Sequence, residues 1–169
     1  SLRRIRLLGP CRRPGTGGLL GPEGQVADRP DVVGAHERVA AVNDVGIAGV
    51  APQASILPVS ALDPAGFGDS STVAKAIIAA TDAGARVINL SLGGPDRDPV
   101  LDKACAYAFA KGAVVVAAGG NSYLNGNKVQ YPAASPDVIA VASVGRTGNP
   151  PGFSNTGSHI AVAAPRASV

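Results

Sequence analysis

The sequence of 169 residues has no tryptophan and no methionine, and aromatic residues make up 4% of it. Its two cysteines are too few for a disulfide framework. No apolar run reaches the roughly 18–20 residues of a membrane-spanning helix. These absences exclude a disulfide-rich scaffold and a helical membrane protein. Hydrophobic residues at 46% can form a core of aliphatic and small side chains in one domain of ordinary size. The lack of a methionine at position 1 predicts a fragment or a processed chain.

Acidic residues are slightly outnumbered, which gives a formal net charge of +3. The whole excess of positive charge lies in residues 1–38, which contain seven arginines and four acidic residues. Residues 39–169 have no net charge. A basic segment can bind nucleic acid or an anionic surface. Residues 1–38 contain no aromatic side chain that could stack on a base, so no nucleic-acid or membrane partner is predicted. We interpret them as an irregular basic head, rich in glycine, proline and arginine and poorly ordered.

Residues 39–169 alternate between unbroken apolar runs and helical patterns. The runs predict buried strands over 54–62, 86–92, 113–118, 138–144 and 159–164. Helices are predicted over 69–84 and 98–112, with inner faces formed by Val73, Ile77 and Ala80 and by Leu101, Cys105 and Ala108. Strands that alternate with helices and are apolar throughout indicate an α/β fold: a mainly parallel sheet in a three-layer arrangement, with helices on both faces.

Local residues mark the ends of both predicted helices. The polar run at 70–72 offers an oxygen for the N-cap of the first helix, and Gly84 suits the left-handed position after its end. Asp98 precedes Pro99, a pair typical of an N-cap and first helical position, and Gly112 ends the second helix.

Two predicted strands run into small residues at their carboxyl ends, where parallel α/β sheets carry their sites. The first end reads LSLGG at 90–94, and the second reads AAGGNS at 117–122. Glycines there let another backbone come close, and Asn121 can point an amide donor into a cleft. The glycines around Asn121 do not have the spacing of a dinucleotide or phosphate loop. The cysteines and histidines do not pair at metal-ligand spacing.

Five segments together resemble the subtilases, the subtilisin-like serine proteases. They are AAVNDVGIAGVAPQASI, GARVINLSLGG, GAVVVAAGGNS, YPAASPDVIAVASVG and FSNTGSHIAVAAPRASV, in the family's order from about residue 39 to residue 169. The resemblance implies the subtilisin-like α/β fold, here incomplete, and hydrolysis of peptide bonds through an acyl-enzyme. It also implies secretion, although no signal peptide is found in this chain.

The resemblance assigns roles to the two glycine-rich strand ends. Asn121 would donate its side-chain amide to the negative oxygen of the tetrahedral intermediate, as part of the oxyanion hole. An extended peptide substrate would pair as an added strand with Ser91, Leu92 and Gly93. Gly119 and Gly120 would line the pocket for the residue before the scissile bond. Tyr131-Pro132 matches a family turn in which the peptide bond is often cis.

The catalytic triad is where the sequence departs from the family. An ungapped alignment puts Asp31 and Gly34 at the two histidines of the family's H-G-T-H motif, and His36 is the nearest candidate base. The D-[ST]-G aspartate motif and the G-T-S-M-A-A-P serine motif are not found. We therefore expect the isolated chain to be inactive.

Three hypotheses about function follow. The first is a fragment of a subtilisin-like serine endopeptidase, which needs no cofactor for its chemistry. The second is a non-catalytic peptide-binding module of the same fold, and the third is a small-molecule-binding doubly wound domain. A G-T-S motif further along the gene would favour the protease. The segment VNDVGIAG resembles a family loop that binds a structural calcium ion, with Asp44 as the candidate ligand.

Overall fold

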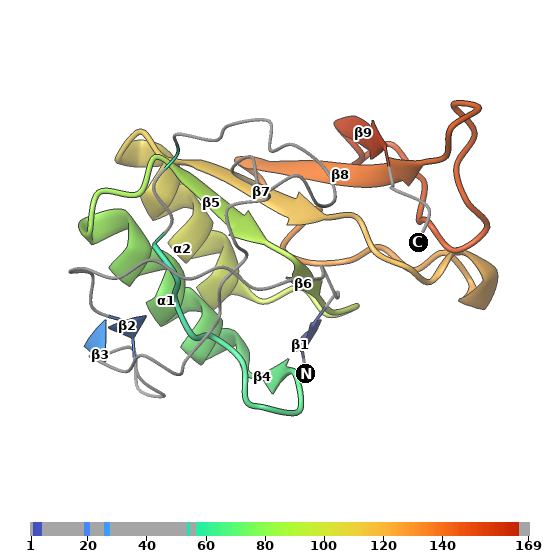
Figure 1. Ribbon diagram of the computed structural model, residues 1–169. Coiled ribbons are helices and arrows are strands. Elements are labelled where there is room, and N and C mark those ends of the chain that lie inside the picture. The colour runs from blue at the N-terminus through green and yellow to red at the C-terminus, as the bar shows by residue number, and fades with distance from the viewer. Residues whose placement is uncertain (1, 5–18, 21–25, 28–53, 55–56, 166–169) are drawn as a thin grey trace, which may run out of the picture.

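The structure is a computed structural model that describes residues 2–4, 19–20, 26–27, 54 and 57–165. Its main sheet has four parallel strands in the order β5-β7-β8-β9 (Figure 1). These strands span Val87–Leu90, Val114–Ala118, Val138–Val144 and Val162–Pro165. Two smaller sheets pair short strands. One has the order β4-β1-β6, from Phe67–Gly68, Leu2–Arg4 and Leu92–Gly93, and the other joins β2 (Leu19–Leu20) to β3 (Val26–Ala27).

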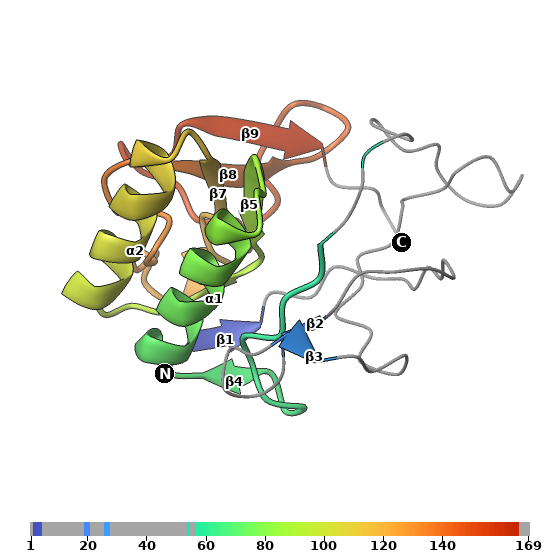
Figure 2. The same cartoon turned by 90° about the vertical axis from the view of Figure 1, so that its left-hand side faces the viewer.

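Two helices, α1 (Ser70–Asp82) and α2 (Pro99–Ala110), lie side by side against one face of the main sheet (Figure 2). A hydrogen bond of 2.6 Å from Tyr107 Oη to Asp82 Oδ1 joins them. Among the described residues, no helix covers the opposite face. Val87 and Val162, on the two outer strands of the main sheet, are exposed. The parallel sheet with its two helices confirms the predicted α/β fold class, and of the predicted three layers the described residues form the sheet and one helical layer.

The helix ends agree with the sequence signals, with one correction. Asp98 caps α2 through a bond of 2.8 Å from Val100 N, and Pro99 begins the helix. Gly84 and Gly112 have φ of +86° and +82°, the left-handed conformation expected there. The N-cap of α1, however, is Asp69 and not the polar run at 70–72. Its carboxylate accepts hydrogen bonds from Thr72 N, Ser71 Oγ and Thr72 Oγ1, so it captures the hydroxyls that were expected to cap.

Three predicted strands differ from the observed ones. In 54–62, Val59 carries a single bridge and the other described residues are irregular, because an apolar run becomes a strand only beside a partner. The run 86–92 is divided at Ser91 into β5 of the main sheet and β6 of the small sheet. The last strand is β9, which begins three residues later than predicted, at Val162. The division at residue 38 stays a prediction, since residues 28–53 lie outside the described part.

The core lies between the two helices and the main sheet. The predicted inner-face residues of both helices are buried there, and the largest fully buried side chains include Ile77, Leu101, Val73 and Val115. Cys105 belongs to this core and has no exposed surface. Burial raises the pKa of its thiol to about 11, and the negative charges of Asp102 and Asp137 act in the same direction.

The Cys105 thiol is therefore expected to resist alkylation by iodoacetamide in the folded chain at mildly alkaline pH, and to react rapidly once guanidinium chloride unfolds it. The measurement uses a Cys11→Ser variant, so that one thiol is followed by mass spectrometry. A neutral buried thiol also favours the folded state, so this contribution to the free energy of unfolding should decline as pH rises from 9.0 toward about 11. Rapid alkylation of the folded chain would contradict the burial of this side chain.

Candidate functional site

The small sheet contains a strand groove, defined here as the space between β4 and β6 that β1 fills. Arg3 pairs with Phe67 on one side and with Gly93 on the other, both antiparallel. Leu2 pairs with Gly68 and Arg4 with Leu92, so each wall contacts β1 through its main chain. Figure 1 shows β1 between the two walls. The groove thus accepts an extended segment as a central strand.

The β6 wall is held in place from its other side. Gly94 N donates to Tyr131 O at 3.0 Å, and Tyr131 N donates back to Gly94 O at 2.8 Å. The Tyr131-Pro132 peptide bond is cis, as the sequence predicted. Just before β6, Asn89 Nδ2 donates to Ser91 Oγ at 3.1 Å. Leu92 and Gly93 are buried and Ser91 is half-buried, so the wall is a fixed element.

A loop over residues 120–128, called here the 120–128 loop, follows β7 at the carboxyl edge of the main sheet. Gly119 and Gly120 are buried, whereas Asn121 is exposed. A methyl group on Gly119 would lie 2.6 Å from Ile160 Cδ1. Gly120 has φ of +111°, and a methyl group there would lie 2.5 Å from Asn155 Nδ2. Glycine is therefore required at position 120, whereas a side chain at position 119 would have to displace the end of Ile160.

The β6 wall and the 120–128 loop lie next to each other. Leu90 of β5 pairs with Ala117 of β7, so both strands end at the same edge of the sheet. The Gln130 side chain lies beside both segments, since it would be 3.5 Å from a methyl group placed on Gly93 and 2.5 Å from one placed on Gly120. The structure therefore brings together Ser91–Gly93 and Gly119–Asn121, the two segments that the sequence singled out.

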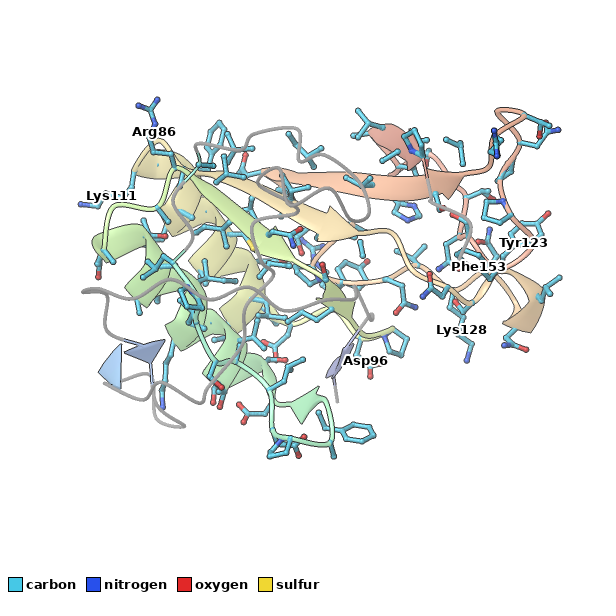
Figure 3. The ribbon with its side chains drawn as sticks, in the orientation of Figure 1. Arg86, Asp96, Lys111, Tyr123, Lys128 and Phe153 are labelled. Atoms are coloured by element: carbon cyan, nitrogen blue, oxygen red, sulfur yellow. The ribbon has the colours of Figure 1, made fainter. Side chains whose placement is uncertain are left out.

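The 120–128 loop is tied to the segment 153–156. Tyr123 N donates to Phe153 O at 3.1 Å, and Figure 3 shows these residues near Lys128, at the opposite end of the sheet from Arg86 and Lys111. Asn127 Nδ2 donates to Thr156 O at 3.1 Å, and Thr156 N donates back to Asn127 Oδ1 at 3.0 Å. Hydrogen bonds thus join the loop to the segment 153–156 at both Tyr123 and Asn127.

Sequence reasoning missed three parts of the site. The β4 wall lies in a segment in which glycines are irregularly spaced. The alternation of glycine with Phe67 and Asp69 in GFGD was the available signal for a strand. Gln130 and Asn155 were missed because their contacts are with residues far away in sequence. The available signal for Asn155 was its place in a polar pair with Ser154 between apolar strands, because such residues are buried only when they are hydrogen-bonded.

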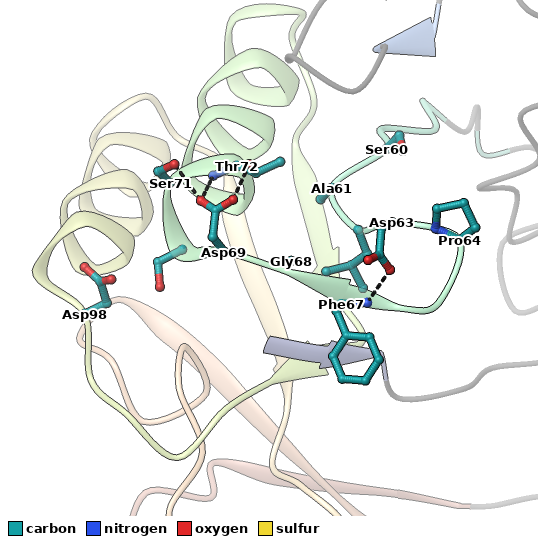
Figure 4. Close-up of a pocket in the computed structure, with 12 residues that line it drawn as sticks. Ser60, Ala61, Asp63, Pro64, Phe67, Gly68, Asp69, Ser71, Thr72 and Asp98 are labelled. Carbon is teal, nitrogen blue, oxygen red and sulfur yellow. Dashed lines mark hydrogen bonds between the residues drawn. The ribbon is translucent and has the colours of Figure 1, made fainter. Parts of the chain in front are cut away.

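A pocket beside the β4 wall is lined by residues 60–64 and 67–72 together with Asp98 (Figure 4). Two of its carboxylates already accept hydrogen bonds from nearby backbone N–H groups, since Asp63 Oδ1 accepts from Phe67 N at 2.8 Å and Asp69 caps α1. Hydrogen bonds from the Ser71 hydroxyl and from Thr72 hold the pKa of Asp69 well below its usual range. Within the described residues, no group of three histidine, cysteine, aspartate or glutamate side chains could hold a metal ion. His36 and Asp44, the candidate base and calcium ligand, lie outside this part of the chain.

Comparison with known proteins gives the family. The subtilase family profile (Peptidase_S8) matches residues 34–167. The chain belongs to the subtilase family. It is 50% identical over 124 residues to thermitase from Thermoactinomyces vulgaris, which covers 73% of this chain and 43% of thermitase. It is 48% identical over 124 residues to a thermophilic serine proteinase of Bacillus sp. (strain AK1), covering 73% and 30% of the two chains.

A solved structure supports the same assignment. The prenylagaramide maturation protease PagA superimposes with a TM-score of 0.65 at 30% identity, over 73% of this subtilase chain and 47% of PagA. The fold is therefore subtilisin-like. The chain spans less than half the length of these relatives. No described helix is long and apolar enough to cross a membrane.

Proposed function

We propose that this chain supplies the substrate groove and the oxyanion donor of a subtilisin-like serine endopeptidase. The observation that carries the proposal is the antiparallel pairing of β1 with both β4 and β6, since the groove already holds an extended segment through its backbone. Ser91, Leu92 and Gly93 would pair with a peptide or protein substrate in the same way. Secretion, which the family resemblance implies, belongs to the same proposal.

The proposed chemistry is hydrolysis through an acyl-enzyme. A serine hydroxyl, to which we assign no residue of this chain, adds to the scissile carbonyl while a base takes its proton, and the carbonyl oxygen becomes negative. The Asn121 amide donates to that oxygen, with Gly119 and Gly120 walling the adjoining pocket. The intermediate collapses with loss of the protonated amine, and water then releases the acid. These steps require no cofactor, and a calcium ion at Asp44 would be structural.

A second candidate is a peptide-binding module that does not cleave. It is favoured by the backbone pairing of β1 with β4 and β6, because holding an extended segment in this way needs no catalytic group. Hydrolysis of a peptide ester by a protein that contains this sequence would decide for the protease, whereas binding without hydrolysis would decide for the module.

Peptide binding by the chain itself is the direct test of the groove. A fluorescent acetyl-Leu-Arg-Arg-Ile peptide, whose first three residues repeat β1, is expected to bind more tightly to a variant that lacks residues 1–6, because the tethered competitor is gone. N-methylation at the second residue of the peptide removes a backbone donor and adds bulk between the two walls, so affinity should fall about tenfold. Fluorescence anisotropy gives both results.

The matched control for that experiment is the same peptide with a propionyl cap, which carries the extra methyl group outside the paired residues. Strand pairing predicts that this control binds like the parent peptide. Equal affinity of the parent and the backbone-methylated peptide would show that recognition does not use the main chain of β4 and β6, and the proposed groove would then be wrong.

A further inference from the structure

Asn155 is a buried polar residue at the centre of the site, with 1% of its surface exposed. We propose that it is a positioning residue that fixes the orientation of Asn121, an inference that rests on the proposed role of Asn121 as oxyanion donor. Sequence position does not suggest the link, since 34 positions separate the two asparagines in the chain. The hydrogen bonds around the 120–128 loop support it.

Asn155 holds both peptide groups that flank Asn121. Its backbone N–H donates to Gly120 O at 3.0 Å, an oxygen of the peptide plane that precedes Asn121. Its side-chain Oδ1 accepts from Ser122 N at 2.7 Å, a nitrogen of the peptide plane that follows Asn121. Because peptide groups are planar, fixing the plane on each side of a residue fixes its φ and ψ. A single residue thus sets the backbone conformation of Asn121.

Asn155 is itself held rigidly. Its Nδ2 donates to Lys128 O at 2.8 Å, which closes the far end of the 120–128 loop on the same side chain. The neighbouring Ser154 Oγ accepts from Ser143 N of β8 at 2.9 Å, so the segment is anchored to the main sheet. The hydrogen bonds of Ser154 and Asn155 therefore connect the 120–128 loop to β8.

Asn121 depends on this support because its own side chain is exposed and has no hydrogen-bond partner among the described residues. An oxyanion donor acts by being oriented before the charge develops, which avoids reorganisation during the reaction. The backbone conformation of Asn121 sets the direction in which its side chain leaves the main chain and the rotamers that are open to it. Without Asn155, the loop could keep its general position and still lose the direction of that amide.

The test compares two peptides that differ in the charge at their carboxyl end. Acetyl-Leu-Arg-Arg-Ile ends in a carboxylate, which resembles the oxyanion, and its carboxamide analogue does not. A correctly placed Asn121 is expected to make the chain bind the carboxylate about tenfold more tightly than the carboxamide. The tethered β1 competes equally with both peptides, so the ratio of their dissociation constants is independent of it. Isothermal titration calorimetry on the whole chain measures this ratio.

Asn155→Ala is expected to abolish the preference for the carboxylate while affinity for the carboxamide changes little. The double variant Asn121→Ala/Asn155→Ala should have the same ratio as Asn121→Ala, since both changes remove one interaction. The matched control is Asn127→Gly, which removes bonds between the same loop and Thr156 and tolerates the φ of 49° at that position. It touches neither peptide plane beside Asn121, so its ratio should equal that of the wild type.

The outcomes separate the two proposals. If the wild type prefers the carboxylate and Asn155→Ala does so equally, Asn155 has no positioning role and the oxyanion role of Asn121 stands. If the wild type has no preference, the oxyanion role is wrong and the inference fails with it. Should Asn155→Ala not fold, the ratio is measured on Asn155→Ser, whose hydroxyl cannot span Ser122 N and Lys128 O together. Fast hydrogen exchange at Ser122 N in the wild type would also overturn the inference, because that amide must then be unbonded.

Discussion

If the proposed function holds, replacing Asn121 by alanine in a proteolytically active protein that contains this sequence is expected to lower kcat about 10²- to 10³-fold and to leave KM nearly unchanged. The donor meets an oxygen that becomes negative in the transition state, so its loss weakens transition-state binding much more than substrate binding. The side chain is exposed beside the groove, and its removal leaves no buried group without a partner. Steady-state kinetics with a chromogenic peptide, on an active protein that contains this chain, gives both constants.

Asn125→Ala is the matched control for that change. Asn125 lies in the same loop, is exposed as well, and ends the short 3-10 helix η1 (Tyr123–Asn125), so its removal should leave kcat unchanged. Asn121→Asp keeps the size of the side chain but turns a donor into a negative acceptor, and it should be at least as damaging as alanine. A full rate in either Asn121 variant would exclude this residue from the oxyanion hole.

Leu101→Ala is expected to reduce the free energy of unfolding of the chain by about 2–5 kcal/mol. Leu101 is 1% exposed, on the face of α2 that lies in the core with Ile77 and Val115. Truncation removes apolar contacts and leaves a cavity that the close-packed surroundings fill only in part. Such a loss is a large share of the roughly 5–15 kcal/mol that stabilises an ordinary domain. Urea unfolding followed by circular dichroism measures the change.

The same substitution at Leu124 is the control. Leu124 is 77% exposed in η1, so Leu124→Ala should change the free energy of unfolding by no more than about 0.5 kcal/mol. Equal effects at the two leucines would mean that Leu101 is not buried between the helices and the sheet. A change in the slope of the urea transition, without a change in its midpoint, would instead point to an altered unfolded state.

Features of the fold that depend on neighbours in sequence could be predicted. Asp98, Pro99 and Gly112 mark the ends of α2 because their own backbone preferences and short-range bonds define those positions. The run at 138–144 is apolar except for Ser143, and it forms β8 with the predicted bounds, where β7 and β9 pair with it on its two edges. Asn121 was likewise singled out from its place after a strand, and its role stays a prediction.

Features that depend on distant partners could not be predicted. Asp69 is the N-cap of α1 because the nearby hydroxyls form stronger hydrogen bonds with its carboxylate than with the backbone N–H groups. The strand groove joins three segments from different parts of the chain, and none of them alone resembles a binding site. Asn155 has an ordinary polar side chain in sequence, and its role follows only from two peptide groups that the fold brings to it.

The position of β1 has a consequence for the order in which the chain folds. The contacts of α1 with α2 and of each main-sheet strand with the next join nearby parts of the sequence, while Arg3 pairs with Phe67 and Gly93, which lie far away in the sequence. Bringing such distant positions together costs entropy before their few backbone bonds repay it, so we expect β1 to dock last. By the same balance it detaches first in native fluctuations. The groove can therefore empty and refill while the helices and the main sheet stay intact.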